Sequence, residues 1–234
     1  MNSGSNIASN VEEVRKRIAA AAERGGRKAE DVHIIAVTKT MGVDVIKEAV
    51  DAGVYDLGEN RVQELMEKYD HIDGGCRWHL IGHLQTNKVK YIIDKVSLIH
   101  SVDSLELVQE IQKRAEKAGK VMDILIQVNV SGEESKFGIS PERVRDFLLG
   151  INGYKNIRVR GLMTVAPFAE NPEEIRWVFR DLHKIFIDIK QERIDNIYMD
   201  YLSMGMSNDF EVAVEEGANM VRIGTAIFGR RNYT

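Results

Sequence analysis

The sequence predicts one closed barrel of eight parallel strands, each followed by a helix (a TIM barrel), with an extra helix ahead of the first strand. Apolar runs of strand length recur eight times along the 234 residues, and amphipathic stretches separate them. The first four runs start roughly 22 residues apart, which is the spacing of one strand–helix unit. A doubly wound open sheet stays as the alternative, because periodicity does not by itself show that a sheet closes.

The amino-terminal helix is predicted from the segment SNVEEVRKRIAAAAERGG, residues 9–26. Ser9 and Glu12 form a capping-box pattern, apolar residues follow at helical spacing, and two glycines end the pattern. Residues 1–8 are mostly polar and precede this cap, so we expect them to be flexible.

The eight strand candidates are rich in apolar residues and are bounded by turn residues. Several are followed by an amphipathic segment such as DVIKEAVDAG or SLELVQEIQKRAEKAG, which predicts a helix. Longer connections are expected after the fifth and sixth candidates, where the spacing increases. The candidates cover residues 32–39, 54–60, 77–83, 97–103, 122–130, 157–165, 196–205 and 220–226.

Composition bounds the class of protein. The chain has three prolines and no linker rich in serine, glycine and proline, so we expect residues 1–234 to form one domain. Its 32 basic and 36 acidic side chains give a net charge of −4, which offers no electrostatic basis for nucleic-acid binding. The single cysteine, Cys76, excludes an internal disulfide and fits a reducing compartment. A secretory signal and a membrane-spanning apolar run are both lacking in the sequence, so a cytoplasmic protein is expected.

Lys39 stands at the end of the first strand candidate, in the stretch AVTKT, residues 36–40. An ammonium in an apolar site tends to lose its proton, and a neutral lysine amine is a nucleophile that reacts with aldehydes. The alternative is a lysine that only marks the end of the strand and extends into water.

The strongest pattern lies at the ends of the last two strands. SMGMSND and RIGTAIFG combine glycines, hydroxyl groups and backbone amides, which suits an anion, at the two loops where barrels usually hold phosphate. The alternative is a tight turn with methionines as core residues and Arg222 in a structural ion pair. The polar or notable residues at all eight strand ends are Lys39, Glu59, Asn60, His83, Asp103, Asn129, Ser131, Met163, Thr164, 203–207 and 222–225.

A lysine and a phosphate site at one barrel mouth would suit pyridoxal 5′-phosphate (PLP), which carries an aldehyde and a phosphate on different sides of its ring. Arg222 lies on the eighth strand candidate, two residues before Gly224 of the phosphate segment, so we expect its side chain to point toward the pyridine nitrogen. Because an arginine keeps its proton, it would leave that nitrogen unprotonated and weaken the ring as an electron sink.

Seven segments together resemble the pyridoxal phosphate homeostasis protein family, also called the YggS-like or proline-synthetase-co-transcribed family, over about residues 10–230. They are AVTKT, GENRVQE, WHLIGHLQTNK, QVNVSGEESKFG, GLMTVAP, SMGMSND and VRIGTAIFG. The resemblance implies a barrel like the amino-terminal domain of alanine racemase. It also implies that the protein binds PLP and takes part in intracellular vitamin B6 homeostasis.

The resemblance also implies the roles of individual residues. It implies a Schiff base between PLP and Lys39, and a place for Asn60 beside the cofactor ring. His83 and Met163 are candidates for further cofactor contacts, although a capping role for His83 is the alternative. The implied phosphate contacts come from Ser207, Gly224, Thr225 and the backbone of Met206. The implied contact of the pyridine nitrogen comes from Arg222.

The resemblance implies a protein that stores, buffers or delivers PLP, with PLP-dependent apoenzymes as partners, and no residue is assigned a catalytic role. Racemases of this fold recruit a second base from a further domain, and the sequence ends eleven residues after Ile223, so we expect that domain to be absent and the protein to be a monomer. Tyr233 is a conceivable substitute base, although a terminal tyrosine is more often a loose surface residue.

Two other functions and several other sites remain as alternatives. The chain could be a PLP-dependent racemase or lyase of low activity, or a barrel isomerase or aldolase that uses Lys39 on a sugar phosphate. His79 and His83 are four residues apart, but they lie on a strand and its exit without a third ligand, so no metal is expected. Cys76 has no adjacent base in the sequence, and Lys136 is interpreted as a solvated loop charge rather than a second phosphate site.

Overall fold

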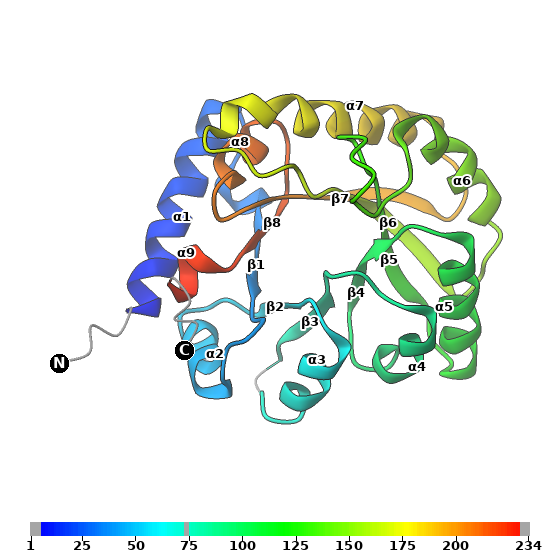
Figure 1. Ribbon diagram of the computed structural model, residues 1–234, viewed down its shortest axis with the longest axis horizontal. Helices are drawn as coiled ribbons and strands as arrows, with labels where there is room; N and C mark the ends of the chain where they lie inside the picture. The colour runs from blue at the N-terminus through cyan, green and yellow to red at the C-terminus, as the bar shows by residue number, and fades with distance from the viewer. Residues whose placement is uncertain (1–5, 73–74, 230–234) are drawn as a thin grey trace.

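The computed structural model describes residues 6–72 and 75–229. Eight parallel strands form a closed barrel in sequential order (Figure 1), so the predicted barrel is confirmed and the open sheet is excluded. The first and last strands close the barrel, with Ile34 paired to Val221. The strands are β1 (His33–Val37), β2 (Asp56–Glu59), β3 (Arg77–Leu80), β4 (Leu98–Val102), β5 (Met122–Gln127), β6 (Ile157–Met163), β7 (Ile197–Met206) and β8 (Met220–Ile223).

Helices surround the barrel on its outer side (Figure 1). The two amphipathic segments that predicted helices at residues 44–53 and 104–119 form α2 and α5, and Ser104 caps α5 by accepting the N–H of Leu107. Within the described residues, none of the helices combines the length and the apolar character that crossing a bilayer requires. The α-helices that follow the strands are α2 (Val43–Asp51), α3 (Val62–Tyr69), α4 (Val89–Ile92), α5 (Leu105–Lys117), α6 (Val144–Ile151), α7 (Arg176–Glu192), α8 (Phe210–Glu215) and α9 (Thr225–Phe228).

The amino-terminal helix α1 (Ile7–Arg24) begins one turn earlier than the sequence predicted. Its N-cap is Asn6, whose side chain accepts the N–H of Ser9 at 3.1 Å, so the proposal that Ser9 is the cap is wrong. Asparagine caps a helix as well as serine does, and the earlier start buries Ile7 against the core. The expected flexibility of residues 1–8 is therefore wrong for Ile7 and Ala8, which are helical, and residues 1–5 lie outside the described part of the chain.

α1 packs beside α8 and α9 (Figure 1), so the start of the chain covers the elements that follow the last two strands. The Asn10 side chain donates to the carbonyl of Ile227 at 2.8 Å, and Arg17 forms an ion pair with Glu211 at 2.8 Å. These contacts attach α1 to the two helices that follow the predicted phosphate loops.

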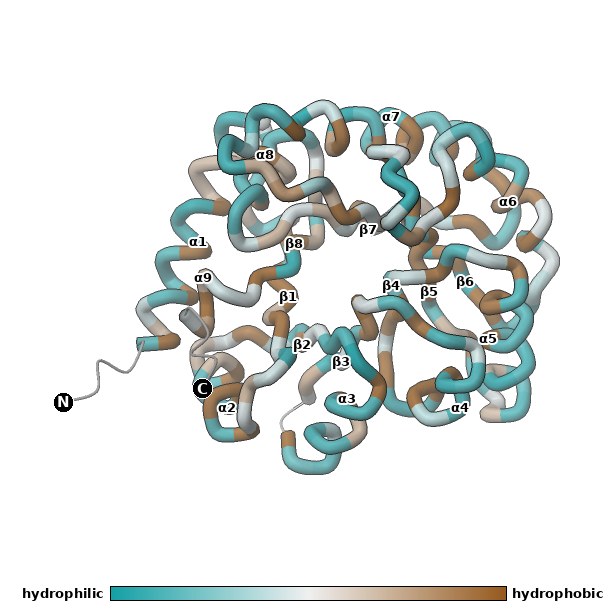
Figure 2. Tube along the Cα trace, viewed as in Figure 1, coloured by the Kyte–Doolittle hydropathy of each residue, from teal (hydrophilic) through white to brown (hydrophobic). Residues whose placement is uncertain are grey.

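The barrel has an apolar layer on each side of its strands. In Figure 2 apolar residues run along the strands, and the outer layer includes the fully buried Leu57 and Phe179. The layer inside the barrel is smaller, and several polar side chains are buried with it, among them the imidazole of His100 and the guanidinium of Arg222. The members of the inner apolar layer are Ile35, Leu98, Leu125, Met163 and Met220.

Candidate functional site

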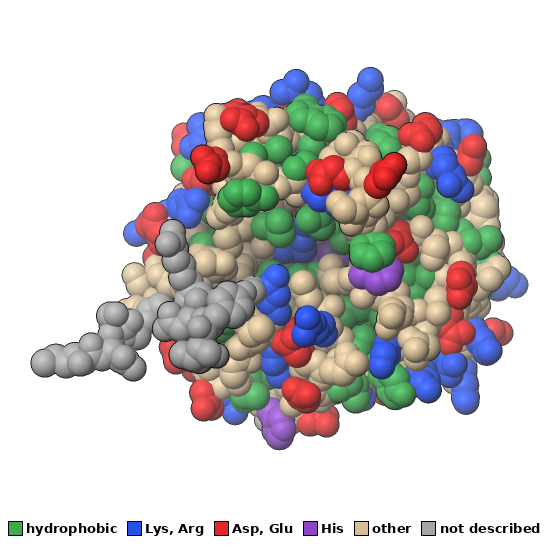
Figure 3. All heavy atoms as spheres, in the orientation of Figure 1, with side chains coloured by type: hydrophobic (Ala, Val, Ile, Leu, Met, Phe, Trp, Pro, Cys, Tyr) green, Lys and Arg blue, Asp and Glu red, His purple; other side chains and the backbone are tan. Residues whose placement is uncertain are grey.

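A pocket of about 370 Å³ opens at the carboxyl ends of β1, β6, β7 and β8. Figure 3 shows a hollow on this face of the molecule, with basic side chains inside it and along its edge. The structure brings six of the residues assigned to the cofactor to its lining. These are Lys39, Met206, Ser207, Arg222, Gly224 and Thr225.

Lys39 is half-buried in this pocket, and its backbone is fixed by its neighbours. Thr40 has a left-handed backbone with φ of 64°, which is unusual for a residue other than glycine, and its N–H donates to Glu64 at 2.7 Å. The carbonyl of Thr38 accepts a hydrogen bond from the ammonium of Lys68 at 2.8 Å. Both peptide neighbours of Lys39 are thus tied to α3, which lies behind the sheet.

The side chains that tie β1 to α3 form an ion cluster of the buried Glu59 and Lys68 with the half-buried Glu64. The Lys68 ammonium lies 2.6 Å from Glu59 Oε1 and 3.4 Å from Glu64 Oε2, and the hydroxyl of Thr38 also donates to Glu59 at 2.6 Å. Burial raises the pKa of Glu59, although the hydrogen bond from Lys68 opposes that shift. The second oxygen, Glu59 Oε2, is buried and has no hydrogen-bond partner among the described residues. The ammonium of Lys68 therefore stabilises the ionised form of Glu59 against the cost of burial.

The predicted phosphate segment converges on the side chain of Ser207. Its hydroxyl oxygen accepts the backbone N–H groups of Gly224 and Ala226, each at 3.2 Å, so two amides from the loop after β8 point at one oxygen from the loop after β7. The hydroxyl hydrogen of Ser207 stays available for an acceptor in the pocket. Gly205, just before this loop on β7, allows α8 to pack closely on the strand, because its φ is 91° and a Cβ there would lie 2.7 Å from Ala213 Cβ.

Asp209 is the last residue of the predicted phosphate segment SMGMSND, and it lies in the pocket lining. Its carboxylate accepts the backbone N–H of Met206 at 2.5 Å, so the amide that was expected to face the phosphate is occupied in this structure. Burial raises the pKa of Asp209, and the charges of Arg222 and Lys136 act against that shift. The pocket lining thus contains one carboxylate, that of Asp209, and three basic side chains, those of Lys39, Lys136 and Arg222.

Arg222 lies on β8 with its guanidinium inside the barrel, and it is 4% exposed. It donates to the hydroxyl of Ser203 at 2.7 Å and to the carbonyl of Thr164 at 2.8 Å. Burial lowers the pKa of Arg222 to about 10, so the side chain keeps its charge at neutral pH. The predicted orientation into the mouth is consistent with its place in the pocket lining.

The lining of this pocket does not include three of the predicted contact residues, Asn60, His83 and Met163. Asn60 follows β2, where its backbone packs against Gly82 so closely that a Cβ on the glycine would lie 2.3 Å from the Asn60 carbonyl oxygen. The His83 ring stacks on Phe137 with 3.8 Å between ring centres and lies 3.9 Å from the Asp103 carboxylate. Met163 packs in the inner apolar layer. Their contacts with a cofactor stay predictions.

Sequence reasoning also missed part of the lining. The segment of residues 165–169 after β6 supplies apolar walls, and Lys136 reaches the same pocket from the loop after β5 and donates to the carbonyl of Val165 at 3.4 Å. Both loops carry segments of the family resemblance, QVNVSGEESKFG and GLMTVAP, but Lys136 was interpreted as a solvated loop charge. That interpretation is wrong, because its side chain lines the pocket. Among the described residues, no group of three or more His, Cys, Asp or Glu side chains is arranged to hold a metal. Tyr233 lies outside the described residues.

Comparison with known proteins agrees with this geometry. The family model described as "Alanine racemase, N-terminal domain" matches residues 5–232. The pyridoxal phosphate homeostasis protein of Aquifex aeolicus is 47% identical over 229 residues, which cover 97% of this chain and 100% of that protein. The protein of the same name from Escherichia coli K12 is 37% identical over 233 residues, which cover 97% of this chain and 98% of that protein.

A solved structure of PipY from Synechococcus elongatus PCC7942, with PLP bound, superposes with a TM-score of 0.84 at 31% identity. The superposition covers 95% of this chain and 100% of PipY. Because relatives of this identity span nearly the whole chain, the family is established together with the fold. The chain belongs to the pyridoxal phosphate homeostasis protein family, whose barrel is that of the amino-terminal domain of alanine racemase.

Proposed function

We propose that this chain binds PLP in the mouth pocket as a Schiff base on Lys39, and that it stores, buffers or delivers the cofactor without turning over a substrate. The observation that carries this proposal is that one pocket of about 370 Å³ is lined by a lysine, a buried arginine and Ser207, whose hydroxyl oxygen accepts two backbone amides. PLP supplies an aldehyde that reacts with an amine, a phosphate and an electron-withdrawing ring.

The residues present fit these three parts of the cofactor. Ser207, Gly224 and Thr225 offer a hydroxyl, backbone amides and a second hydroxyl for a phosphate, and the two amides that meet at Ser207 Oγ already bind an oxygen atom. When PLP is bound, we expect the Met206 N–H to leave the Asp209 carboxylate and to donate to the phosphate. Lys39 lies in the same lining from β1, which is the neighbour of β8 in the closed barrel.

Two features support a binding protein rather than an amino-acid racemase. Arg222 is buried and stays charged, and an arginine does not give its proton to a pyridine nitrogen. The ring nitrogen beside it would stay unprotonated, which makes the ring a weak electron sink. A racemase also needs an acid or base on each face of the reacting carbon. Besides Lys39, the described lining offers Lys136 and Asp209 for this role, and both are engaged, Lys136 with the Val165 carbonyl and Asp209 with the Met206 N–H.

The test of binding is the absorbance spectrum of the purified protein with PLP, before and after borohydride, followed by mass mapping of the labelled peptide. We expect a Schiff-base absorbance that borohydride removes and a label on Lys39. A label on Lys136, the other lysine of the pocket, would contradict the assignment.

The test of turnover is α-deuterium exchange of alanine and serine in heavy water, followed by NMR. We expect exchange at the rate of free PLP, and a faster rate would favour the racemase or lyase alternative. Transfer of PLP to an apoenzyme, measured as recovered activity of that enzyme, tests the delivery role. The monomeric state, the single domain and the cytoplasmic location stay predictions, to be checked by sedimentation, limited proteolysis and cell fractionation.

A further inference from the structure

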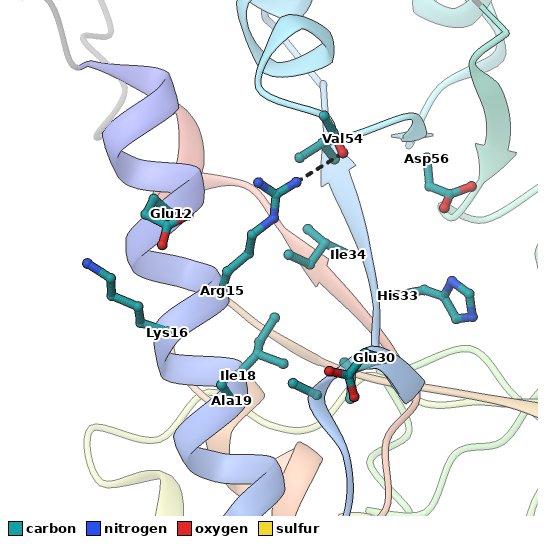
Figure 4. Close-up of a pocket in the computed structure, with 13 residues that line it drawn as sticks. Glu12, Arg15, Lys16, Ile18, Ala19, Glu30, His33, Ile34, Val54 and Asp56 are labelled. Atoms are coloured by element: carbon teal, nitrogen blue, oxygen red, sulfur yellow. Dashed lines mark hydrogen bonds between the residues drawn. The ribbon is translucent and has the colours of Figure 1, made fainter.

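An unbroken line of hydrogen-bonded side chains runs through the inside of the barrel from its base to the mouth pocket. We call it the interior chain. At the base, Arg77 donates to both carboxylate oxygens of Asp56, from Nε at 2.6 Å and from Nη2 at 2.7 Å. Figure 4 shows the side chains of Asp56 and His33 directed away from α1, on the inner side of β1. The members of the interior chain, in spatial order, are Arg77, Asp56, His79, His100, Ser203 and Arg222.

The middle of the interior chain consists of two histidines and a serine. Asp56 Oδ1 lies 3.0 Å from His79 Nε2, His79 Nδ1 lies 3.0 Å from His100 Nε2, and His100 Nδ1 lies 3.0 Å from the hydroxyl of Ser203. The same hydroxyl accepts the hydrogen bond from Arg222 at 2.7 Å. The two imidazoles and the serine are at most 3% exposed, so hydrogen bonds to bulk water cannot replace these partners.

The two ends of the interior chain fix the direction of every hydrogen bond between them. Arg222 is only a donor, and an ionised Asp56 is only an acceptor. Burial opposes the ionisation of Asp56, but hydrogen bonds from His79 and Arg77 outweigh it and hold its pKa well below the usual range. Burial, and then the neighbouring His79 and Arg222, lower the pKa of His100, so its imidazole is neutral.

One proton arrangement satisfies all of these groups. His79 carries its proton on Nε2 and gives it to Asp56, and its bare Nδ1 accepts the Nε2 proton of His100. The bare Nδ1 of His100 accepts the hydroxyl proton of Ser203, whose oxygen accepts from Arg222. Each donor then meets one acceptor, and no buried polar atom of the interior chain is left without a partner.

We propose that Asp56, at the end of the barrel opposite the mouth, is a positioning residue for Arg222. It acts through the tautomers of His79 and His100, which commit the Ser203 proton to His100 and leave the Ser203 oxygen to hold the guanidinium. That bond and the bond to the Thr164 carbonyl fix the plane of Arg222. The consequence for the pyridine nitrogen of PLP rests on the proposed function.

The variant that reverses the interior chain is Asp56→Asn. An asparagine amide that donates to His79 Nε2 forces the His79 proton onto Nδ1 and the His100 proton onto Nδ1, so two donors meet at Ser203 and its own proton loses its acceptor. In both amide orientations the NH₂ group meets one Arg77 donor, Nε in the first and Nη2 in the second. Only the first orientation reverses the interior chain, and the position of the His100 proton reports that it has formed.

Asp123→Asn is the matched control. Asp123 lies in the same hollow of about 240 Å³ at the base of the barrel as Asp56. It is held by two arginines, Arg158 and Arg160, and none of its hydrogen bonds in the structure leads to Ser203. The control therefore loses an arginine-paired carboxylate of the same hollow without changing a hydrogen bond of the interior chain.

The experiment records the ring-nitrogen NMR signals of the histidines and the guanidinium signals of Arg222 in the full chain, with and without PLP. In the parent we expect a proton on Nε2 and none on Nδ1 for both His79 and His100, with sharp Arg222 signals. Asp56→Asn should move the His100 proton to Nδ1, broaden the Arg222 signals and raise the Kd for PLP about threefold or more, while Asp123→Asn changes none of these. Ser203→Ala should also broaden Arg222, with the tautomer of His79 unchanged.

Three results would overturn the proposal. The first is a His100 proton on Nδ1 in the parent, which needs no variant and no folding control. The second is Arg222 signals that stay sharp in Ser203→Ala, or in Asp56→Asn when the His100 proton has moved to Nδ1. The third is equal effects of Asp56→Asn and Asp123→Asn. Failure of the parent to bind PLP would refute the proposed function alone, because the tautomers and the guanidinium signals test the interior chain without the cofactor.

Discussion

Lys39 and Arg222 line the same pocket, but the protein fixes different parts of the two residues. Around Lys39 it fixes the backbone, through the ion cluster of Glu59, Lys68 and Glu64 on the outer side of the sheet. At Arg222 it fixes the side chain itself, by hydrogen bonds inside the barrel. A fixed backbone at Lys39 sets where its amine can reach, whereas an arginine that acts by its charge works best when the guanidinium itself is held.

The largest effect is expected when Lys39 is removed. Lys39→Ala should abolish the covalent link to PLP completely while leaving the fold intact, because the residue is half-buried at a loop and contributes little to the core. Borohydride trapping followed by mass mapping measures the link. Lys136→Ala, which changes the other lysine of the pocket, is the control and should keep the link. An undiminished link in Lys39→Ala would assign the covalent bond to another amine.

The ion cluster behind Lys39 is tested by Lys68→Met. Removing this ammonium leaves the buried Glu59 carboxylate without its counter-charge, so we expect the free energy of unfolding to fall by about 3–5 kcal/mol. Urea denaturation measures the change. The double variant Glu59→Gln with Lys68→Met should recover part of the loss, because no uncompensated charge remains. Equal loss in the single and double variants would show that packing, rather than charge, explains the effect.

The phosphate segment is tested by Ser207→Ala combined with Thr225→Ala. Each variant removes one hydroxyl, and a hydrogen bond to a charged group is worth about 1.5–3 kcal/mol, so we expect PLP binding to weaken by about 3 kcal/mol or more. Equilibrium dialysis measures the affinity, and it should be done in a Lys39→Ala background so that the covalent link does not mask the change. Unaltered affinity would place the phosphate elsewhere.

The smallest effect is a pH dependence that comes from the interior chain. Because the pKa of His100 is lowered by burial in the folded protein, the unfolded chain binds a proton below about pH 6.5 that the folded protein does not. Stability should therefore fall as pH decreases, and the slope from this residue should grow from about 0.7 kcal/mol per pH unit at pH 6.5 toward about 1.4 at lower pH. Parallel urea titrations of the parent and His100→Gln measure the difference in slope. Identical slopes would mean that His100 is protonated in the folded protein.

Much of the fold followed from local patterns. The eight apolar runs, the turn residues between them and the amphipathic segments predicted every strand of the barrel, because these signals depend on neighbouring residues. The start of α1 was misjudged by one turn, since Asn6 and Ser9 are equally good caps and only the burial of Ile7 decides between them.

The sequence by itself determined which residues stand at the barrel mouth, because the end of each strand could be read from its composition. That was enough to bring Lys39, Ser207 and Arg222 to one pocket. Only the tertiary structure decided what holds them. His79 and His100 are 21 positions apart, and His100 and Ser203 are 103 apart, so their hydrogen bonds exist only after the strands pair around the barrel and turn these side chains inward. Lys68 likewise finds Thr38 only when α3 packs behind β1. A closed barrel brings distant strands to one axis, and no local pattern records which side chains meet there.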